Sequence, residues 1–185
     1  DVPHELLIVY DFPSDNSVPV VKSFQKTYPN LRSVYNQKGR GVINAIRSGV
    51  EVAKNEYILI LTADDLGPVL TVEKMRDLMD QGCDVVSATR YAYGGRVLGG
   101  HILSKLFSRS INKLSHLLGV SAMTDSTVGL KMFKKSVFNK IRLECAPVGW
   151  VWAYEFAIKA QEMKFRMGEV PIISINRFYG GKSSF

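Results

Sequence analysis

The alternation of short apolar runs with segments of helical periodicity is the feature that most constrains the fold of this chain. Runs typical of buried strands cover residues 5–10, 31–35, 57–61 and 84–89. Segments with helical spacing or a capping residue lie between them, over residues 18–27, 42–53 and 70–79. Because short turns join these segments, the pattern predicts a largely parallel sheet with right-handed helical crossovers. We therefore expect an α/β protein whose first half is Rossmann-like.

The second half of the chain contains a conspicuous amphipathic segment over residues 101–118. Apolar residues such as Ile102 and Phe107 alternate there with basic residues such as Lys105 and Arg109. Two interpretations stay open: a helix packed on the core with a solvated basic face, or a helix on an anionic membrane surface with its basic face toward the lipid headgroups. The absence of acidic residues over 97–123 favours the membrane surface. A strand after residue 127, a helix over 151–162 and extended chain over 165–175 follow.

The charge of the chain indicates an anionic partner. The 185 residues suffice for one domain with a sizeable core, and they carry a formal net charge of +7. Anionic lipid and phosphorylated substrates fit this charge; nucleic acid would also fit, but no nucleic-acid-binding motif accompanies it. A dinucleotide-binding oxidoreductase is disfavoured because no G-x-G-x-x-G follows a strand. No apolar segment is long enough for a transmembrane helix, and the two cysteines lack metal-ligand spacing.

Polar residues follow three of the predicted strands. Asp64 and Asp65 follow the run over 57–61 after Thr62 and Ala63, where open α/β sheets bind ligands, and carboxylate oxygens are ligands that Mg²⁺ prefers. A polar exit from the strand is the plainer interpretation of this pair. Asp11 follows the first strand, and Asp15 could face a ligand or cap the next helix. The Gly39-Arg40-Gly41 turn at a helix start could bind an anion through backbone N–H groups.

The order of these motifs resembles family 2 glycosyltransferases of the GT-A fold, nearest to the branch of dolichol- or polyprenyl-phosphate mannosyltransferases. The resemblance extends from Leu6 to Phe185. It rests on Asp11-Phe-Pro-Ser-Asp15, Lys38-Gly-Arg-Gly41, Thr62-Ala-Asp64, Arg90-Tyr91 with Gly94-Gly95, Asp125-Ser-Thr-Val-Gly-Leu-Lys131, Gly149-Trp150 with Glu155, Glu169-Val-Pro-Ile172, and Arg177 with Gly181-Lys182-Ser183.

The resemblance implies one domain over residues 1–185, with a nucleotide-sugar-binding half over 1–96 and a smaller acceptor- and membrane-facing half over 97–185. The implied fold has a Rossmann-like, mostly parallel central sheet flanked by helices. Three departures from the family pattern stand out. No segment matches the family's first strand, Thr62 replaces the first acid of the Asp-x-Asp motif, and Lys105 stands near the place of a family arginine.

The family's activity would be inverting transfer of a sugar, most simply mannose or glucose, from a GDP- or UDP-linked donor to a polyprenyl or dolichyl phosphate. A lipid monophosphate is largely dianionic at neutral pH, so cationic positioning matters more than a base. The resemblance also implies Mg²⁺ or Mn²⁺ as cofactor and a peripheral location on the cytoplasmic face of a membrane. The residues that it implies are Asp64, Arg90 and Asp125 for catalysis; Asp11, Asp15, Gly39, Gly41, Asp64 and Arg90 for the donor; Lys105, Lys131, Arg177 and Lys182 for the acceptor phosphate; and Asp64 and Asp65 for the metal.

Two other functions are compatible with the sequence. A saccharide acceptor would need a carboxylate to take the proton of its hydroxyl group, and Asp125 is the best candidate for that base. A non-catalytic module that binds a nucleotide sugar or a lipid surface would be compatible with Thr62 and with the unmatched first strand.

Overall fold

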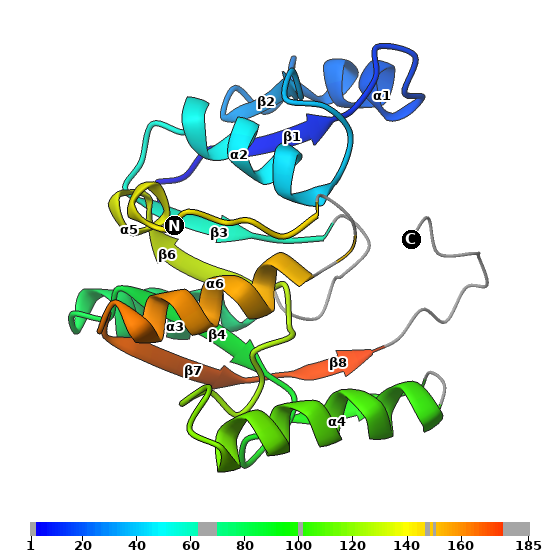
Figure 1. Ribbon diagram of the computed structural model, residues 1–185. Helices are drawn as coiled ribbons and strands as arrows, with labels where there is room; N and C mark the ends of the chain where they lie inside the picture. The colour runs from blue at the N-terminus through cyan, green and yellow to red at the C-terminus, as the bar shows by residue number, and fades with distance from the viewer. Residues whose placement is uncertain (1–2, 63–69, 100–101, 147–148, 150, 176–185) are drawn as a thin grey trace.

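The computed structural model describes residues 3–62, 70–99, 102–146, 149 and 151–175 (Figure 1). Helices and strands alternate through the first half, as the sequence predicts. The elements are β1 (Leu6–Tyr10), α1 (Ser17–Phe24), β2 (Leu31–Tyr35), α2 (Val42–Val52), β3 (Tyr57–Ile60), α3 (Val72–Asp80), β4 (Val85–Thr89), β5 (Arg96–Leu98), α4 (Ile102–Leu117), β6 (Lys131–Lys134), α5 (Lys135–Lys140), α6 (Val151–Glu162), β7 (Met167–Pro171) and β8 (Ile173–Ile175).

The described strands form three hydrogen-bonded sheets. β1 pairs in parallel with β2, and β5 pairs in parallel with β8. The remaining four strands form a sheet in the order β3-β6-β4-β7, in which β7 is parallel to β4 and β6 is antiparallel to both of its neighbours. The predicted α/β fold with parallel-rich sheets flanked by helices is confirmed, and β6 adds antiparallel pairing to it.

The β1–β2 pair is separate from the four-stranded sheet. Within the described residues, β1 has β2 as its strand partner and β3 has β6. Figure 1 shows β1 and β2 at the top of the molecule, with α2 beside them and β3 below. Gly49 of α2 allows a close approach to β1, because a Cβ atom there would lie 3.2 Å from Cγ2 of Val9. The absence of the family's first strand stays a prediction.

The four-stranded sheet carries a core on each of its faces. Side chains of a strand point alternately to its two faces, so Val85 and Phe133 join one cluster while Val86 and Met132 join the other. Helices α2, α5 and α6 cover the first face, and α3 covers the second. Every residue of β4 is buried, as expected for a strand with helices on both sides. Packing on both faces therefore holds the carboxyl end of β4 in place.

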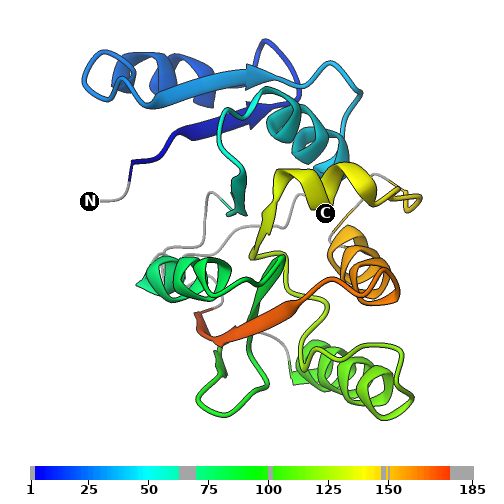
Figure 2. The ribbon, with the colours of Figure 1, turned by 90° about the vertical axis from the view of Figure 1, so that its left-hand side faces the viewer.

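Helix α4 lies at the margin of the molecule, below β7 and β8 in Figure 1, and Figure 2 shows it at the same end from the side. No described helix is both long and apolar enough to cross a membrane.

Candidate functional site

Asp11 fixes the glycine-containing turn that leads into helix α2. Its Oδ2 accepts a hydrogen bond from the backbone N–H of Gly41 at 3.0 Å, and its Oδ1 accepts one from Nδ2 of Asn36 at 2.7 Å. Gly39 and Gly41 have φ angles of 90° and 120°, which side chains other than glycine rarely allow. Asp11 thus joins the carboxyl ends of β1 and β2 to the start of α2.

Two exposed side chains meet beside this turn. The guanidinium Cζ of Arg40 lies 5.1 Å from the ring centroid of Phe12, which is the geometry of a cation–π contact. Asp15 lies farther along the same loop, where its Oδ1 accepts a hydrogen bond from the backbone N–H of Ser17 at 2.8 Å and so caps the start of α1. The structure therefore brings Asp11, Gly39 and Gly41 together, whereas Asp15 has a capping contact.

Arg90 and Asp125 form an ion pair at the carboxyl end of β4. Nε of Arg90 lies 2.6 Å from Oδ2 of Asp125, and Nη2 lies 2.9 Å from Oδ1, so the pair is bidentate. The Asp125 side chain is fully buried, while 21% of the Arg90 side chain is exposed. Burial acts to lower the pKa of Arg90, but its hydrogen bonds to Asp125 and the charge of that carboxylate outweigh burial and raise the pKa. This geometry favours Asp125 as an anchor for Arg90.

Hydroxyl and amide groups from two other segments complete the environment of this pair. Nη2 of Arg90 donates to Oγ1 of Thr127 at 2.9 Å and approaches Oγ of Ser108, on α4, at 3.3 Å. Nδ2 of Asn112, also on α4, lies 3.3 Å from Oδ1 of Asp125. Nη1 of Arg90 has no acceptor among the described residues. The protein thus holds one edge of the guanidinium and leaves the other edge for a further oxygen ligand.

A second carboxylate holds the backbone that carries Asp125. Glu169, on β7, accepts hydrogen bonds from the backbone N–H of Thr124 and Asp125 and from the Thr124 hydroxyl, at 3.0 to 3.2 Å. Oγ1 of Thr124 also lies 2.7 Å from Oγ1 of Thr89, the last residue of β4. The segment before Asp125 is therefore connected to both β4 and β7.

Lys131 lies inside the molecule. Its side chain is fully buried, and its Nζ donates to Oγ of Ser87 at 2.8 Å. Burial lowers the pKa of Lys131 to about 8, although the charges of Asp125 and Glu169 act in the opposite direction. This position differs from the surface position expected for contact with an acceptor phosphate, because β6 lies between β3 and β4 with a core on each face of the sheet.

Helix α4 is oriented with its polar side inward. Asn112 and Ser115 are buried, whereas the apolar residues Leu103 and Phe107 are 79% and 70% exposed. Ile102, Leu106, Leu114 and Leu117 are exposed as well. The interpretation of α4 as a core-packing helix with a solvated basic face is therefore wrong, because its apolar residues lie in solvent and its uncharged polar residues contact the Asp125 segment.

The basic residues of α4 do not form the opposite face either. Arg109 and Lys113 are exposed together with the apolar residues, and Lys105 is half-buried. The outward surface of α4 is thus apolar with basic residues interspersed.

The predicted residues Asp64, Asp65, Arg177 and Lys182 lie outside the described residues. Their roles in metal and phosphate binding stay predictions. Within the described ranges, no three His, Cys, Asp or Glu side chains are grouped so that they could hold a metal ion. The prediction of a bound metal ion therefore rests on the carboxylate chemistry of Asp64 and Asp65 alone.

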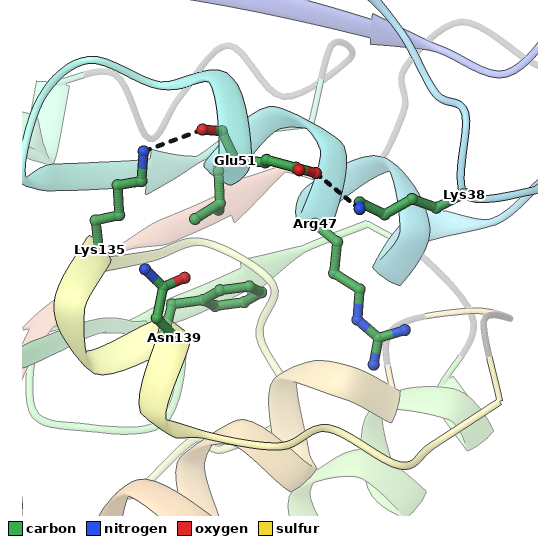
Figure 3. Close-up of a pocket in the computed structure, with 7 residues that line it drawn as sticks. Lys38, Arg47, Glu51, Lys135 and Asn139 are labelled. Atoms are coloured by element: carbon green, nitrogen blue, oxygen red, sulfur yellow. Dashed lines mark hydrogen bonds and ion pairs between the residues drawn. The ribbon is translucent and has the colours of Figure 1, made fainter.

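A hollow of about 330 Å³ lies elsewhere, between α2 and α5 (Figure 3). Lys38 and Glu51 form an ion pair at 2.7 Å on its rim, and Lys135 donates to the Glu51 carbonyl at 3.1 Å. Arg47 donates to the Leu143 carbonyl at 2.7 Å. Because these cations already have acceptors in the protein, the hollow has little left with which to bind an anion.

Several residues of the site were not identified from the sequence. Asn112 and Ser108 were missed because only contact with the Asp125 segment distinguishes them from other polar residues of an amphipathic helix. Glu169 was noted within a motif, but its link to Thr124 spans 45 residues and has no local signal. Asn36 could have been suspected, because it follows a predicted strand directly, as Asp11 does.

The fold and these clusters define an α/β protein with polar sites at the carboxyl ends of its strands, the edge at which such proteins bind ligands. The chain belongs to glycosyl transferase family 2, whose family model matches residues 2–142. Sequence alone had indicated this family, and the match confirms it.

Curated relatives with 22–23% identity match 91% of the chain. They are a dolichyl-phosphate β-glucosyltransferase of Trichomonas vaginalis (22%, 52% of its length), a dolichol-phosphate mannosyltransferase of Pyrococcus furiosus (23%, 47%) and a dolichyl-phosphate β-glucosyltransferase of Saccharomyces cerevisiae (23%, 56%). The chain thus spans about half the length of these relatives. The crystal structure of a mycobacterial protein aligns with 95% of this chain and 58% of its own, with a TM-score of 0.70 and 12% identity, and supports the fold alone.

Proposed function

We propose that this chain catalyses the inverting transfer of a sugar, mannose or glucose, from a nucleoside diphosphate donor to a polyprenyl or dolichyl phosphate at a membrane surface. The observation that carries the proposal is the arrangement of Arg90: Asp125 holds its Nε and Nη2, Nη1 has no acceptor among the described residues, and Nη2 lies 3.3 Å from Oγ of Ser108 on the inward side of α4. A held cation on one side of a helix whose outward side is apolar suits an acceptor with a phosphate head and a hydrocarbon tail. The names of the curated relatives support this acceptor class.

Arg90 would bind the acceptor phosphate through the edge that Asp125 does not occupy. Its Nε and Nη2 are committed to Asp125, which fixes the plane of the guanidinium. Nη1 can then donate to a phosphate oxygen without losing that anchor, and the phosphate needs orientation more than deprotonation. Lys105, Arg177 and Lys182 are further candidates for the same phosphate.

On the donor side, Asp11 would act by shaping the Gly39–Gly41 turn against which the nucleotide lies. The exposed pair of Phe12 and Arg40 supplies an apolar surface and a positive charge beside that turn. A divalent cation, Mg²⁺ or Mn²⁺, would stabilise the charge that develops on the departing diphosphate, and Asp64 with Asp65 would hold it.

Helix α4 would bring the protein to the membrane. Its exposed apolar residues would enter the interfacial region, and Arg109 and Lys113 would reach anionic headgroups. No acidic residue occurs over 97–123 to oppose this attraction. A peripheral position on the cytoplasmic face is part of the same proposal.

The test is transfer of radiolabelled mannose from GDP-mannose, or glucose from UDP-glucose, to dolichyl phosphate in anionic vesicles with Mn²⁺ or Mg²⁺. We expect labelled lipid from one of the two donors. EDTA and the substitution Asp64→Ala should each abolish this labelled product. Arg90→Lys keeps the charge but loses the planar guanidinium, so its kcat/KM should fall about tenfold to a hundredfold. Arg142→Lys is the matched control, because the Arg142 side chain is 90% exposed. Absence of labelled lipid with every donor, metal and lipid phosphate would contradict the proposal.

A further inference from the structure

Helix α4 has a buried polar stripe as well as an exposed apolar surface. Asn112 and Ser115 are buried and Ser108 is half-buried; the three recur at helical spacing, and Asn112 is only 1% exposed. A buried amide must find hydrogen-bond partners, because an unpaired one is costly. The partners of Asn112 therefore determine what α4 is connected to.

Asn112 connects α4 to the loop that carries Asp125. Its Oδ1 accepts a hydrogen bond from the backbone N–H of Ser126 at 2.8 Å. Its Nδ2 lies 3.0 Å from Oγ1 of Thr127 and 3.3 Å from Oδ1 of Asp125, and it also donates to the Ser108 carbonyl at 2.9 Å. The amide thus contacts three consecutive residues of the loop.

The same loop residues hold Arg90. Asp125 binds Nε and Nη2 of Arg90, and Thr127 accepts from Nη2 at 2.9 Å. A shift of α4 that moves Asn112 must therefore either move these acceptors or leave buried polar groups unpaired. Ser108 of α4 lies 3.3 Å from Nη2, so the helix also contacts the guanidinium directly.

We propose that Asn112 is a positioning residue that couples the attachment of α4 to a lipid surface with the orientation of Arg90. When the apolar residues of α4 enter the membrane interface, the helix is fixed in place, and Asn112 transmits this restraint through Asp125 and Thr127. Arg90 then holds its free edge toward the acceptor phosphate. This inference rests on the proposed function, because it assigns a second role to the membrane-binding helix.

The acceptor for the test is citronellyl phosphate, a short prenyl phosphate that needs no membrane for solubility. Empty vesicles of phosphatidylglycerol and phosphatidylcholine are added to the purified protein with its donor. For the wild type, we expect the vesicles to lower the KM for this acceptor about tenfold, the effect of one well-placed hydrogen bond to a charged group, with a smaller change in kcat. Asn112→Ala should bind the vesicles as the wild type does, yet show no such change in KM.

Ser115→Ala is the matched control. Ser115 is buried on the same side of α4, but its hydroxyl contacts Tyr154 of α6 at 2.7 Å and not the Asp125 loop. This variant should keep the response to vesicles, and urea unfolding of both variants reports any loss of stability. An unchanged vesicle response in Asn112→Ala, or an equal loss of response in both variants, would overturn the proposal.

A readout without turnover separates this inference from the proposed function. Hydrogen exchange of the backbone amides over residues 89–92 and 124–127 should slow when vesicles are added to the wild type and to Ser115→Ala, but not for Asn112→Ala. If the wild type transfers no sugar but shows this pattern, the coupling stands and the proposed function fails. If transfer occurs without this pattern, the coupling fails and the proposed function stands.

Discussion

Replacing Lys131 by methionine should stabilise the protein at neutral pH. The ammonium is fully buried and has one hydrogen bond, to Ser87. The difference between its ordinary pKa of 10.5 and the value of about 8 in the folded protein corresponds to about 3 kcal/mol of unfavourable free energy for the charged form. Methionine is unbranched and similar in length, and Ser87 still donates to the Ala88 carbonyl after the substitution. We therefore expect Lys131→Met to gain about 2–3 kcal/mol at pH 7, within the range found when buried charges are replaced.

The gain should depend on pH in a defined direction. Below pH 8, Lys131 is charged in both the folded and the unfolded protein, so the full penalty is present. Between about pH 8 and 10.5 the folded protein loses this proton while the unfolded chain retains it, so the stability of the wild type rises with pH in this window. The advantage of Lys131→Met over the wild type should therefore shrink across the window and be nearly gone at its upper end.

Urea unfolding at pH 7, 8, 9 and 10 without added salt, followed by tryptophan fluorescence, measures the difference in unfolding free energy between Lys131→Met and the wild type. Lys134→Met is the matched control on the same strand. The hydrogen bond from Lys134 to Asp84 raises the pKa of Lys134, so its contribution is complete at every pH below 10.5 and the deficit of that variant should stay constant from pH 7 to 10. A Lys131→Met protein that is less stable than the wild type at pH 7, or whose advantage does not change with pH, would refute the reasoning.

Three further predictions concern other ionised groups. Arg90→Ala should lower the free energy of unfolding by about 3–5 kcal/mol, because it leaves the buried Asp125 carboxylate without its cation. Adding Asp125→Leu should recover part of this loss. Urea unfolding measures both changes, and an unchanged stability of Arg90→Ala would contradict the prediction. Burial acts to raise the pKa of Glu155, but hydrogen bonds from a lysine and from backbone amides outweigh it and lower the pKa to about 2, so its stabilising contribution is present above pH 4.5 and is lost as pH falls toward 2. Glu155→Gln should then be less stable than the wild type at pH 5 and should converge with it near pH 2, whereas a gap that persists to pH 2 in urea unfolding would argue against this. Asp11→Ala should weaken nucleotide diphosphate binding about tenfold in calorimetric titration while Asp15→Ala changes it little, and equal effects of the two would count against the assigned placement.

Elements with strong local patterns could be predicted from the sequence. The runs that became β1 to β4 are short apolar stretches, and α2 has apolar residues at helical spacing; these elements and α6 were found with boundaries within a few residues of those expected. β5 (Arg96–Leu98) and α5 (Lys135–Lys140) were not predicted. Each is too short to show a period, and β5 exists by pairing with β8, more than seventy residues later.

The residues of the candidate site likewise include some that could be predicted from the sequence and some that could not. Asp11 and Arg90 could be selected because each directly follows a strand, and the Gly39–Gly41 turn because it lies between a strand and a helix; the carboxyl ends of strands meet at one edge. The inward polar side of α4 could not be predicted, because amphipathic spacing locates an apolar face without saying whether protein or another phase covers it. Similarly, the motif that ends in Lys131 does not reveal that β6 lies between two strands with its lysine inside.

The separation of β1 from β3 has a consequence for how this domain behaves when handled alone. A strand with one unpartnered edge presents a row of backbone donors and acceptors that another extended chain can join. Among the described residues, β1 and β3 each have one edge without a strand partner, and Leu6 of β1 and Tyr57 of β3 are exposed. At high protein concentration, a neighbouring molecule can add a strand at such an edge. This self-association would use backbone hydrogen bonds between uncharged groups and would therefore resist high salt.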